Sequence, residues 1–274
     1  MSDAADPYAG MTPVERKLAI GEAATPSPFW PWLATVLARM VGRVLWGVRV
    51  SGREHVPMDG PLIVAVTHES VLDPVVVSGA MPRRLRFLAR SSLFGPVGEY
   101  TAWGRFLLQL GAVPIEREGG GARQVIKLAR KLLKRGDAVL IFPEGTRSLE
   151  GEVQRFRRGV GLIARGAKCP VLPISVDGTR RAWPRGRKFP RFFVGPAHVR
   201  IGPPITFDKT TSAEDVAAIV RDAVLDLRGP DAVDGCPEQT GSRTETPAGD
   251  GAGSDAAPGG GPSQGGTAGN DRQN

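Results

Sequence analysis

The feature of this sequence that most constrains its fold is an alternation of apolar, β-branched runs with helical stretches, beginning near residue 50. Five short runs are typical of buried strands, at 61–67, 85–89, 111–115, 138–142 and 171–176. Helical patterns lie between and after them, near 74–80, 94–109, 121–135, 157–166 and 213–228. Since strands that alternate with helices form sheets covered on both sides, we predict an α/β fold with a mixed, largely parallel central sheet flanked by helices.

Composition divides the chain into four segments. Residues 1–28 are polar with scattered prolines and are expected to form a flexible leader. Residues 229–274 hold 12 glycines, 5 prolines and hardly any large aliphatic residues, so this tail cannot bury enough apolar surface to offset the entropy of ordering, and we predict that it is disordered. Between them we expect an apolar helix at 29–48 and the folded domain at 49–228.

The segment 29–48 is strongly apolar and has helical periodicity. Its large apolar residues form one broad stripe, whereas Thr35, Arg39 and Arg43 lie on the opposite face. Its length could just span a bilayer, but two arginines near its middle, at roughly 2.5 to 3.5 kcal/mol each on insertion scales, argue against spanning. We predict an amphipathic helix that lies in the membrane interface. Docking of this helix on the protein's own core is the alternative, and different faces could serve both.

Charge and cysteine content limit the function classes. The net charge is +8, and because residues 229–274 carry −5, the remainder of the chain carries +13. A basic body favours anionic partners such as phosphorylated substrates or an acidic membrane, while no basic helix with an aromatic stacking motif supports nucleic-acid binding. The 2 cysteines predict no disulfide framework, and no run of residues has metal-ligand spacing.

The stretch "VTHESVLDPVVV" places His68 and Asp73 at the end of a predicted strand. Pro74 suits the first turn of the next helix, which predicts that Asp73 is its N-cap. In a continuous helix the two side chains would point about 140° apart, but across a strand-to-helix turn they can meet. Asp73 could then fix the imidazole tautomer and leave the other ring nitrogen of His68 as a general base. A helix cap beside an unrelated histidine is the alternative.

The stretch "FPEGTRS", residues 142–148, also follows a predicted strand. Gly145 lets backbone amides approach a ligand closely, Thr146 offers a hydroxyl, and Arg147 offers a planar fork that suits phosphate. A surface turn with an internal pair between Glu144 and Arg147 is the alternative. Arg117 adds a further cation just past another strand.

Together, four blocks resemble the glycerolipid acyltransferase family typified by lysophosphatidic acid acyltransferase. They follow the family's order: the His-x-x-x-x-Asp block at 68–73, "GAVPIER" ending in Arg117, "FPEGTRS" at 142–148 with "FRRG" at 156–159 downstream, and "CPVLPISV". "FPEGTRS" is the most diagnostic, and the resemblance covers roughly residues 45–205. Thr67 stands where the family usually has asparagine, and Pro114 lies within the second block, but neither departure removes a reacting group.

The resemblance implies transfer of a fatty acyl group from acyl-CoA or acyl carrier protein to the sn-2 hydroxyl of 1-acyl-glycerol-3-phosphate, giving phosphatidic acid. His68 and Asp73 would be catalytic, with no covalent acyl-enzyme, no metal and no cofactor beyond the acyl donor. Arg117, Glu144, Gly145, Thr146 and Arg147 would bind substrate. The partners would be membrane lipid and the donor, at the cytoplasmic face of the cell membrane as a peripheral or monotopic protein. Acylation of another lyso-lipid or polar-lipid acceptor, or an inactive membrane-binding scaffold, remains the alternative.

Overall fold

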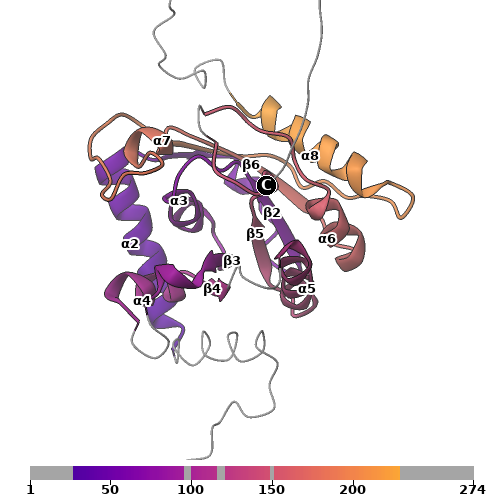
Figure 1. Cartoon of the computed structure of the whole chain (residues 1–274), viewed down its shortest axis with the longest axis horizontal. Coiled ribbons are helices and arrows are strands. Elements are labelled where there is room, and N and C mark those ends of the chain that lie inside the picture. Colours follow the sequence, from indigo (N-terminus) through magenta and orange to yellow (C-terminus); the bar gives the residue numbers. More distant parts are fainter. Residues whose placement is uncertain (1–26, 96–99, 116–120, 149–150, 229–274) are drawn as a thin grey trace, which may run out of the picture. The chain divides into compact units, whose positions relative to one another are not determined.

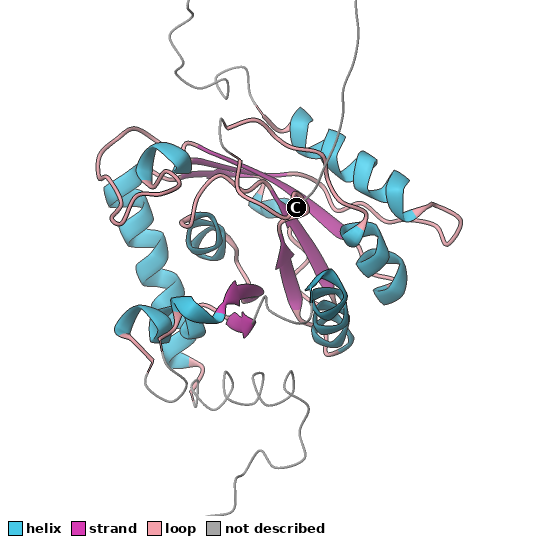
Figure 2. Ribbon diagram, viewed as in Figure 1, coloured by secondary structure: helices cyan, strands magenta, loops and turns pink. Residues whose placement is uncertain are grey.

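The computed structural model describes residues 27–95, 100–115, 121–148 and 151–228, so nearly all of the predicted leader and the whole predicted tail lie outside it. The described residues form a seven-stranded sheet with helices on both faces (Figures 1 and 2). The strands are β1 (Arg49–Ser51), β2 (Leu62–Val66), β3 (Leu85–Arg90), β4 (Ala112–Ile115), β5 (Ala138–Ile141), β6 (Val171–Asp177) and β7 (His198–Ile201). The helices are α2 (Phe29–Trp46), α3 (Asp73–Ala80), α4 (Ala102–Gln109), α5 (Gly121–Lys134), α6 (Gly159–Ala167), α7 (Thr179–Ala182) and α8 (Ala213–Asp226).

The sheet has the strand order β1-β7-β6-β2-β5-β3-β4. The strands β6, β2, β5, β3 and β4 are mutually parallel, whereas β7 is antiparallel to β6, and β1 is parallel to β7. The predicted mixed, largely parallel α/β sheet is therefore confirmed. Because β2 and β5 are parallel neighbours, the segments that follow them emerge at the same edge of the sheet.

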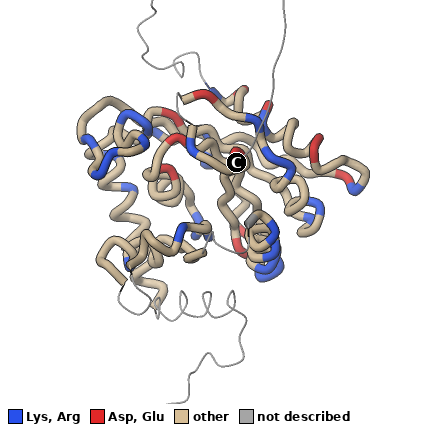
Figure 3. Tube along the Cα trace, viewed as in Figure 1, with Lys and Arg blue, Asp and Glu red and all other residues tan. Residues whose placement is uncertain are grey.

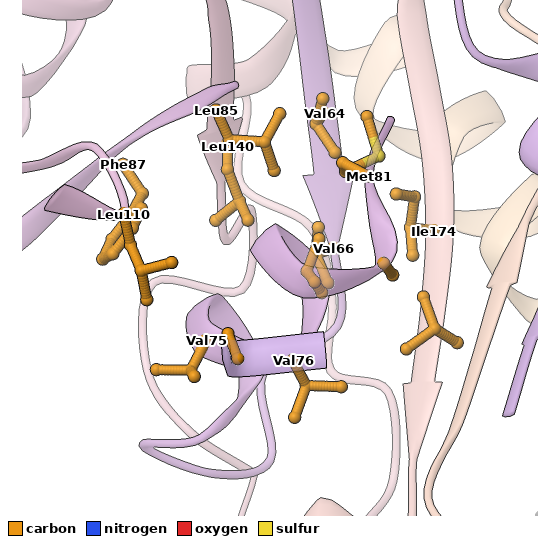
Figure 4. Close-up of a cluster of buried hydrophobic side chains, with 14 of the residues drawn as sticks. Val64, Val66, Val75, Val76, Met81, Leu85, Phe87, Leu110, Leu140 and Ile174 are labelled. Atoms are coloured by element: carbon orange, nitrogen blue, oxygen red, sulfur yellow. The ribbon is translucent and has the colours of Figure 1, made fainter. Parts of the chain in front are cut away.

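Two hydrophobic cores cover the two faces of the sheet. Along β2, Leu62, Val64 and Val66 face the core beneath α2, α3 and α4, while Ile63 and Ala65 face the core beneath α5, α6 and α8. Figure 4 shows part of the first core, where Val64 and Val66 of β2 lie close to side chains of α3 and of neighbouring strands. The continuous apolar run that predicted a buried strand thus serves two cores at once.

The predicted strands all form, each within about one residue of its expected ends. Sequence reasoning missed β1 and β7, because β1 is three residues long and half-exposed, and β7 alternates buried with half-buried residues in a short run. The helix expected at 94–109 begins only at Ala102, since the Thr101 hydroxyl accepts a hydrogen bond from the Gly104 amide at 3.0 Å and caps the helix there.

Helix α2 docks on the domain through its small residues. Ala34, Ala38 and Gly42 are buried, and a Cβ built on Gly79 of α3 would lie 3.0 Å from the backbone nitrogen of Arg39, so the two helices are in close contact. Trp46 near its C-terminal end is also buried, but most of the large apolar side chains of α2 point away from the domain. They are 37–66% exposed and comprise Phe29, Trp30, Trp32, Leu33, Leu37, Met40 and Val44. Docking on the core is therefore confirmed for one face only, and the other face leaves the apolar stripe at the surface.

Candidate active site

Two loops meet at the carboxyl edge of the sheet and are joined by hydrogen bonds. The first, residues 67–72, follows β2, and the second, residues 142–148, follows β5. The His68 amide donates to Glu144 Oε1 at 2.9 Å, and the Ser148 amide donates to the His68 carbonyl at 2.7 Å. The backbone amide and the backbone carbonyl of His68 are thus both held by the second loop.

His68 and Asp73 lie in direct contact. The distance from His68 Nδ1 to Asp73 Oδ2 is 2.8 Å, and the imidazole stacks on the Phe142 ring with centroids 3.8 Å apart and planes 16° apart. The Asp73 side chain is 0% exposed and that of His68 19%. A carboxylate only accepts hydrogen bonds, so this contact favours the tautomer with its proton on Nδ1. Within the described part of the chain no residue hydrogen-bonds to Nε2, which leaves that nitrogen available as a proton acceptor.

The predicted helix-cap role of Asp73 is wrong. Asp73 is the first residue of α3, and Leu72 occupies the N-cap position without any side-chain cap. The carboxylate instead turns back over the preceding loop, where Oδ2 accepts from the amides of Glu69 at 2.7 Å and Ser70 at 2.8 Å. The other oxygen, Oδ1, accepts from the Thr179 hydroxyl at 2.5 Å. Four donors thus converge on one buried carboxylate and hold the loop and the imidazole together.

Glu144 supports the same loop from the other side. It is buried, and its Oε2 accepts from the Gln154 amide at 3.2 Å while its Oε1 holds the His68 amide. Desolvation by burial raises the pKa of this carboxyl, although the two backbone hydrogen bonds oppose that effect. Both oxygens are occupied by protein, which favours positioning of His68 over direct contact with a substrate.

The remaining polar side chains of the first loop are also occupied. Thr67 is buried, and its hydroxyl donates to the Val176 carbonyl at 3.0 Å and accepts from the Val176 amide at 2.8 Å, which extends the pairing of β2 with β6. Ser70 is buried and its hydroxyl donates to the Trp183 carbonyl at 2.8 Å. Threonine at position 67 is therefore compatible with a fixed loop, because its short hydroxyl satisfies both backbone groups of Val176.

A buried ion pair also secures the residue after His68. Glu69 Oε1 accepts from Arg228 Nη2 at 2.6 Å, and their side chains are 2% and 12% exposed. Arg228 Nη1 donates to the Gly151 carbonyl at 2.8 Å as well. The chain just beyond α8 is thus tied to the first loop, 159 residues away in sequence.

The second loop presents a different kind of surface. Gly145 has φ +75°, a conformation that disfavours other residues, and an added Cβ there would lie 2.9 Å from Arg157 Nε. Gly145 is exposed, and Thr146 and Arg147 are half-buried. Arg157, from the "FRRG" segment, donates through Nε to the Glu144 carbonyl at 3.2 Å. Arg117 lies outside the described residues.

An apolar groove of about 400 Å³ adjoins the first loop. Its walls come from α2, α3, α4 and the segment after α7, and they include Leu72, which lies between His68 and Asp73 in sequence. The two faces of α4 have different surroundings: Trp103 and Phe106 line the groove, whereas Leu107 and Leu108 are in the core. Such size and apolar lining are typical of ligand pockets.

Sequence reasoning missed Thr179, Phe142 and Arg228 as members of this site. Thr179 could have been found, because it lies two residues after β6 and the ends of parallel strands share one edge. Phe142 belongs to the recognised "FPEGTRS" stretch, but nothing in the sequence shows that its ring stacks on an imidazole. Arg228 ends a predicted helix and carries no signal of its partner.

Comparisons with known proteins agree with the geometry. A protein-family model described as Acyltransferase matches residues 47–177, a stretch that contains every site residue predicted from the sequence. The chain is 35% identical to a Bacillus subtilis 1-acyl-sn-glycerol-3-phosphate acyltransferase over 134 residues, which is 48% of this chain and 63% of that protein. It is 32% identical to a Pseudomonas aeruginosa protein of the same name over 176 residues, 64% of each.

The matched part of the chain thus spans slightly less than two thirds of these relatives' own length. Among solved structures, a 1-acyl-sn-glycerophosphate acyltransferase from Thermotoga maritima superposes with a TM-score of 0.57 at 24% identity. That match covers 80% of this chain and 83% of the other, and supports the fold.

Proposed function

From the match of residues 47–177 to the Acyltransferase family model, we propose that the protein transfers a fatty acyl group from a thioester donor to the sn-2 hydroxyl of 1-acyl-glycerol-3-phosphate, giving phosphatidic acid. The observation that carries the proposal is the contact between His68 Nδ1 and Asp73 Oδ2, in a loop whose Leu72 lines an apolar groove. Both acyl-CoA and acyl carrier protein fit this proposal as donors.

His68 acts as the general base. Its Nε2 removes the proton of the acceptor hydroxyl as the hydroxyl oxygen attacks the thioester carbonyl, and the same proton then passes to the departing thiolate. Asp73 keeps Nδ1 protonated and stabilises the imidazolium that forms between the two steps. The fixed backbone on both sides of His68 supports this role, because the ring needs no reordering before reaction.

The reaction proceeds without a covalent acyl-enzyme. A thioester is already activated, so direct attack by the acceptor hydroxyl is sufficient. Ser70 is the nearest serine in the first loop, but it is buried, donates to the Trp183 carbonyl and accepts from the Leu72 amide at 3.2 Å. These contacts give Ser70 a structural role and support direct transfer from the thioester to the acceptor hydroxyl.

The apolar groove holds an acyl chain. Its wall at Leu72 and Val75 lies beside the loop that carries His68, so a chain bound there would have its carboxyl end near the imidazole. Trp103 and Phe106 of α4 contribute the opposite wall. The apolar stretch of α4 therefore serves both ligand and core, through different faces of one helix.

The acceptor's phosphate binds near the second loop. Arg147 and Thr146 supply a guanidinium and a hydroxyl, and Gly145 leaves the backbone of the turn accessible. Arg157 lies against Gly145 and adds a cation that sequence reasoning did not assign. Arg117 follows β4, whose carboxyl end faces the same sheet edge, which supports its inclusion.

Helix α2 attaches the protein to a membrane surface. A comparison with α5 supports this proposal: α5 buries Leu128, Leu132 and Leu133 and exposes Lys127 and Lys134, the usual pattern of a helix on a soluble core. In α2 the small residues are inside and most of the large apolar ones, apart from Trp46, are outside, which is typical of an interfacial helix. None of the helices within the described ranges is long and apolar enough to cross a bilayer.

The function is tested with purified protein, acyl-CoA and a panel of acceptors: 1-acyl-glycerol-3-phosphate, dihydroxyacetone phosphate and a lyso-ornithine lipid. We expect turnover of 1-acyl-glycerol-3-phosphate, with little for the acceptor that lacks phosphate. If only the lyso-ornithine lipid were turned over, it would replace 1-acyl-glycerol-3-phosphate as the proposed acceptor. The panel is repeated with acyl carrier protein as the donor, and no turnover of any acceptor with either donor would favour an inactive scaffold.

Membrane attachment is tested with surface substitutions rather than by deletion of residues 1–48, because the deletion would also remove the buried Trp46. Met40→Ser and Val44→Ser together remove side chains that are 61% and 66% exposed. We expect weaker co-flotation with lipid vesicles and unchanged thermal stability. Ile219→Ser on α8, also an exposed apolar residue, is the matched control. Equal flotation of both variants and the unaltered protein would contradict attachment through α2.

A further inference from the structure

The segment that joins α7 to β7 carries an unusual surface. Three of its aromatic side chains are exposed: Phe189 at 76%, Phe192 at 50% and Phe193 at 76%. The stretch 178–197 contains six arginines and lysines and no aspartate or glutamate. Figure 3 shows these cations gathered on the loop beside α7. We refer to residues 184–193 as the aromatic-basic loop.

The backbone of this loop is fixed to the domain. The Trp46 indole donates to the Arg191 carbonyl at 2.7 Å, and the Phe193 amide donates to the Leu45 carbonyl at 2.9 Å, so the loop is held at the C-terminal end of α2. The Trp183 indole donates to the Arg187 carbonyl at 2.8 Å within the same segment. The exposed phenylalanines therefore project from an anchored backbone.

Phe193 is difficult to explain by folding alone. Its φ of +57° lies in the left-handed region, which asparagine and glycine adopt more readily, at a cost of roughly 1 kcal/mol for other residues. Its ring is 76% exposed and so gains little from burial in the protein. A large apolar side chain that is both strained and exposed indicates a partner outside the chain.

The loop also adjoins the surfaces assigned above to lipid. Pro190 and Trp183 line the apolar groove together with Leu37 of α2, and Phe192 packs against Trp46 with ring centroids 5.8 Å apart. Figure 1 shows α7 beside one end of α2. The exposed apolar stripe of α2, the groove and the aromatic-basic loop therefore form neighbouring parts of one side of the domain.

We propose that the aromatic-basic loop is a second membrane-contact element, which inserts Phe189 and Phe193 among the headgroups of an anionic bilayer and places its cations against the lipid phosphates. Aromatic rings favour the headgroup region, and each lysine or arginine near an anionic surface adds attraction. The absence of acidic residues from 178–197 makes the charge complementary to such a surface. The inference extends the membrane attachment proposed for α2 and does not depend on the acyl-transfer chemistry.

The apolar part is tested with the full chain carrying Phe189→Ser and Phe193→Asn, which leaves Phe192 on Trp46. Binding is measured by co-sedimentation with phosphatidylcholine vesicles that contain 30% phosphatidylglycerol, without substrate. We expect vesicle affinity to fall by roughly tenfold or more, with a melting temperature that is unchanged or higher because asparagine relieves the strain at position 193. Ile219→Ser is the control. Vesicle affinity equal to that of the control would overturn the proposal.

The ionic part is tested by Arg185→Gln, Arg187→Gln and Lys188→Gln in one variant. Its matched control changes three exposed cations of α5, namely Arg123, Lys127 and Lys134, to glutamine. We expect the loop variant to lose affinity for the anionic vesicles by several-fold for each charge and to lose little on pure phosphatidylcholine. Equal losses from both triple variants would show general charge attraction and overturn the proposal.

A loss confined to the KM for acyl-CoA, with vesicle binding unchanged, would assign the loop to the nucleotide of the donor and would also overturn the proposal. Vesicle binding and acyl transfer are separate readouts. A protein with no transferase activity whose loop variants still lose vesicle affinity would support the loop inference and contradict the proposed function alone.

Discussion

The two loops at the carboxyl edge of the sheet differ in the burial and bonding of their polar side chains. In the first loop, Thr67, Glu69 and Ser70 are buried with protein partners, and Asp73 behind them is fully buried. His68 Nε2 has no hydrogen-bond partner among the described residues. In the second loop Glu144 is turned inward, whereas Gly145 and Arg147 lie at or near the surface. This difference supports the proposed roles, which are proton transfer for the first loop and substrate binding for the second.

This comparison predicts that substitutions in the two loops will change different kinetic constants. Changes in the first loop and its supports should lower kcat with little change in KM, since they alter an interaction made in the transition state. Changes at the surface of the second loop should raise KM for the acceptor and leave kcat nearly intact.

Asp73→Asn should have the largest effect. An asparagine at this position turns an NH₂ group toward some of the four donors that now bond the carboxylate, and it no longer stabilises the imidazolium. We expect kcat to fall by roughly 10²- to 10⁴-fold, with a loss of about 1 to 3 kcal/mol in the free energy of unfolding. Steady-state kinetics and urea denaturation measure both quantities. A kcat within threefold of the unaltered protein would remove Asp73 from the mechanism.

Glu144→Gln tests the support of His68 from the second loop. The glutamine side chain has only one acceptor oxygen, so it can bond only one of the backbone amides of His68 and Gln154. We expect the free energy of unfolding to fall by about 1 kcal/mol or more and kcat to fall by roughly tenfold.

The contribution of Glu144 to the free energy of unfolding should change with pH in a definite direction. Because burial raises the pKa of Glu144, the neutral carboxyl is favoured in the folded state, and the stability it contributes is present below the ordinary pKa of 4.5 and lost as the pH rises through the higher folded value. The unfolding free energy of the unaltered protein minus that of Glu144→Gln should therefore decrease from pH 4 toward pH 7. An increase over this range would mean that the hydrogen bonds outweigh the desolvation.

Thr179→Val should have a smaller effect confined to kcat. It removes the hydroxyl that donates to Asp73 Oδ1 and preserves the side-chain shape, so we expect a decrease of about threefold to tenfold in kcat with an unchanged KM. Thr179→Ser keeps the donor and should restore most of the activity. If serine and valine behaved alike, the hydroxyl would have no positioning role.

Arg147→Ala should have the smallest effect on kcat and act mainly on binding. We expect the KM for 1-acyl-glycerol-3-phosphate to rise several-fold or more, since one charge-assisted contact to phosphate is lost. Arg158→Ala is the control, because Arg158 is exposed and pairs with Glu214 of α8 at 3.6 Å. An Arg147→Ala enzyme with an unaltered KM would place the acceptor's phosphate elsewhere.

The strands of the sheet and the contacts of the site differ in how far the sequence alone predicts them. The five mutually parallel strands could be predicted because a strand of a parallel sheet covered on both faces reads as a largely apolar run. The short outer strands β1 and β7 could not, since their pairing depends on neighbours far along the chain. Both strands are short and only partly buried, which leaves a weak pattern in their own residues.

In the site, the proximity of His68 and Asp73 could be predicted from a strand, a turn and Pro74. The direction of the Asp73 carboxylate could not, because capping its own helix and bonding the preceding loop are both compatible with that sequence. One of the four donors that hold it, the Thr179 hydroxyl, lies 106 residues away. The ion pair of Glu69 with Arg228 has the same character, since neither residue alone indicates its partner.

The central claim is that Nε2 of His68 removes the acceptor's proton, and one measurement tests it most directly. Turnover of 1-acyl-glycerol-3-phosphate with acyl-CoA is compared for the unaltered protein, His68→Gln and His55→Gln, a control at a histidine remote from Asp73 whose ring contacts the Ile201 carbonyl. We predict that His68→Gln lowers kcat by roughly 10²- to 10⁴-fold with an unchanged melting temperature and vesicle affinity, while His55→Gln stays near the unaltered value. A folded His68→Gln protein that turns over within a few-fold of the unaltered protein would contradict the claim.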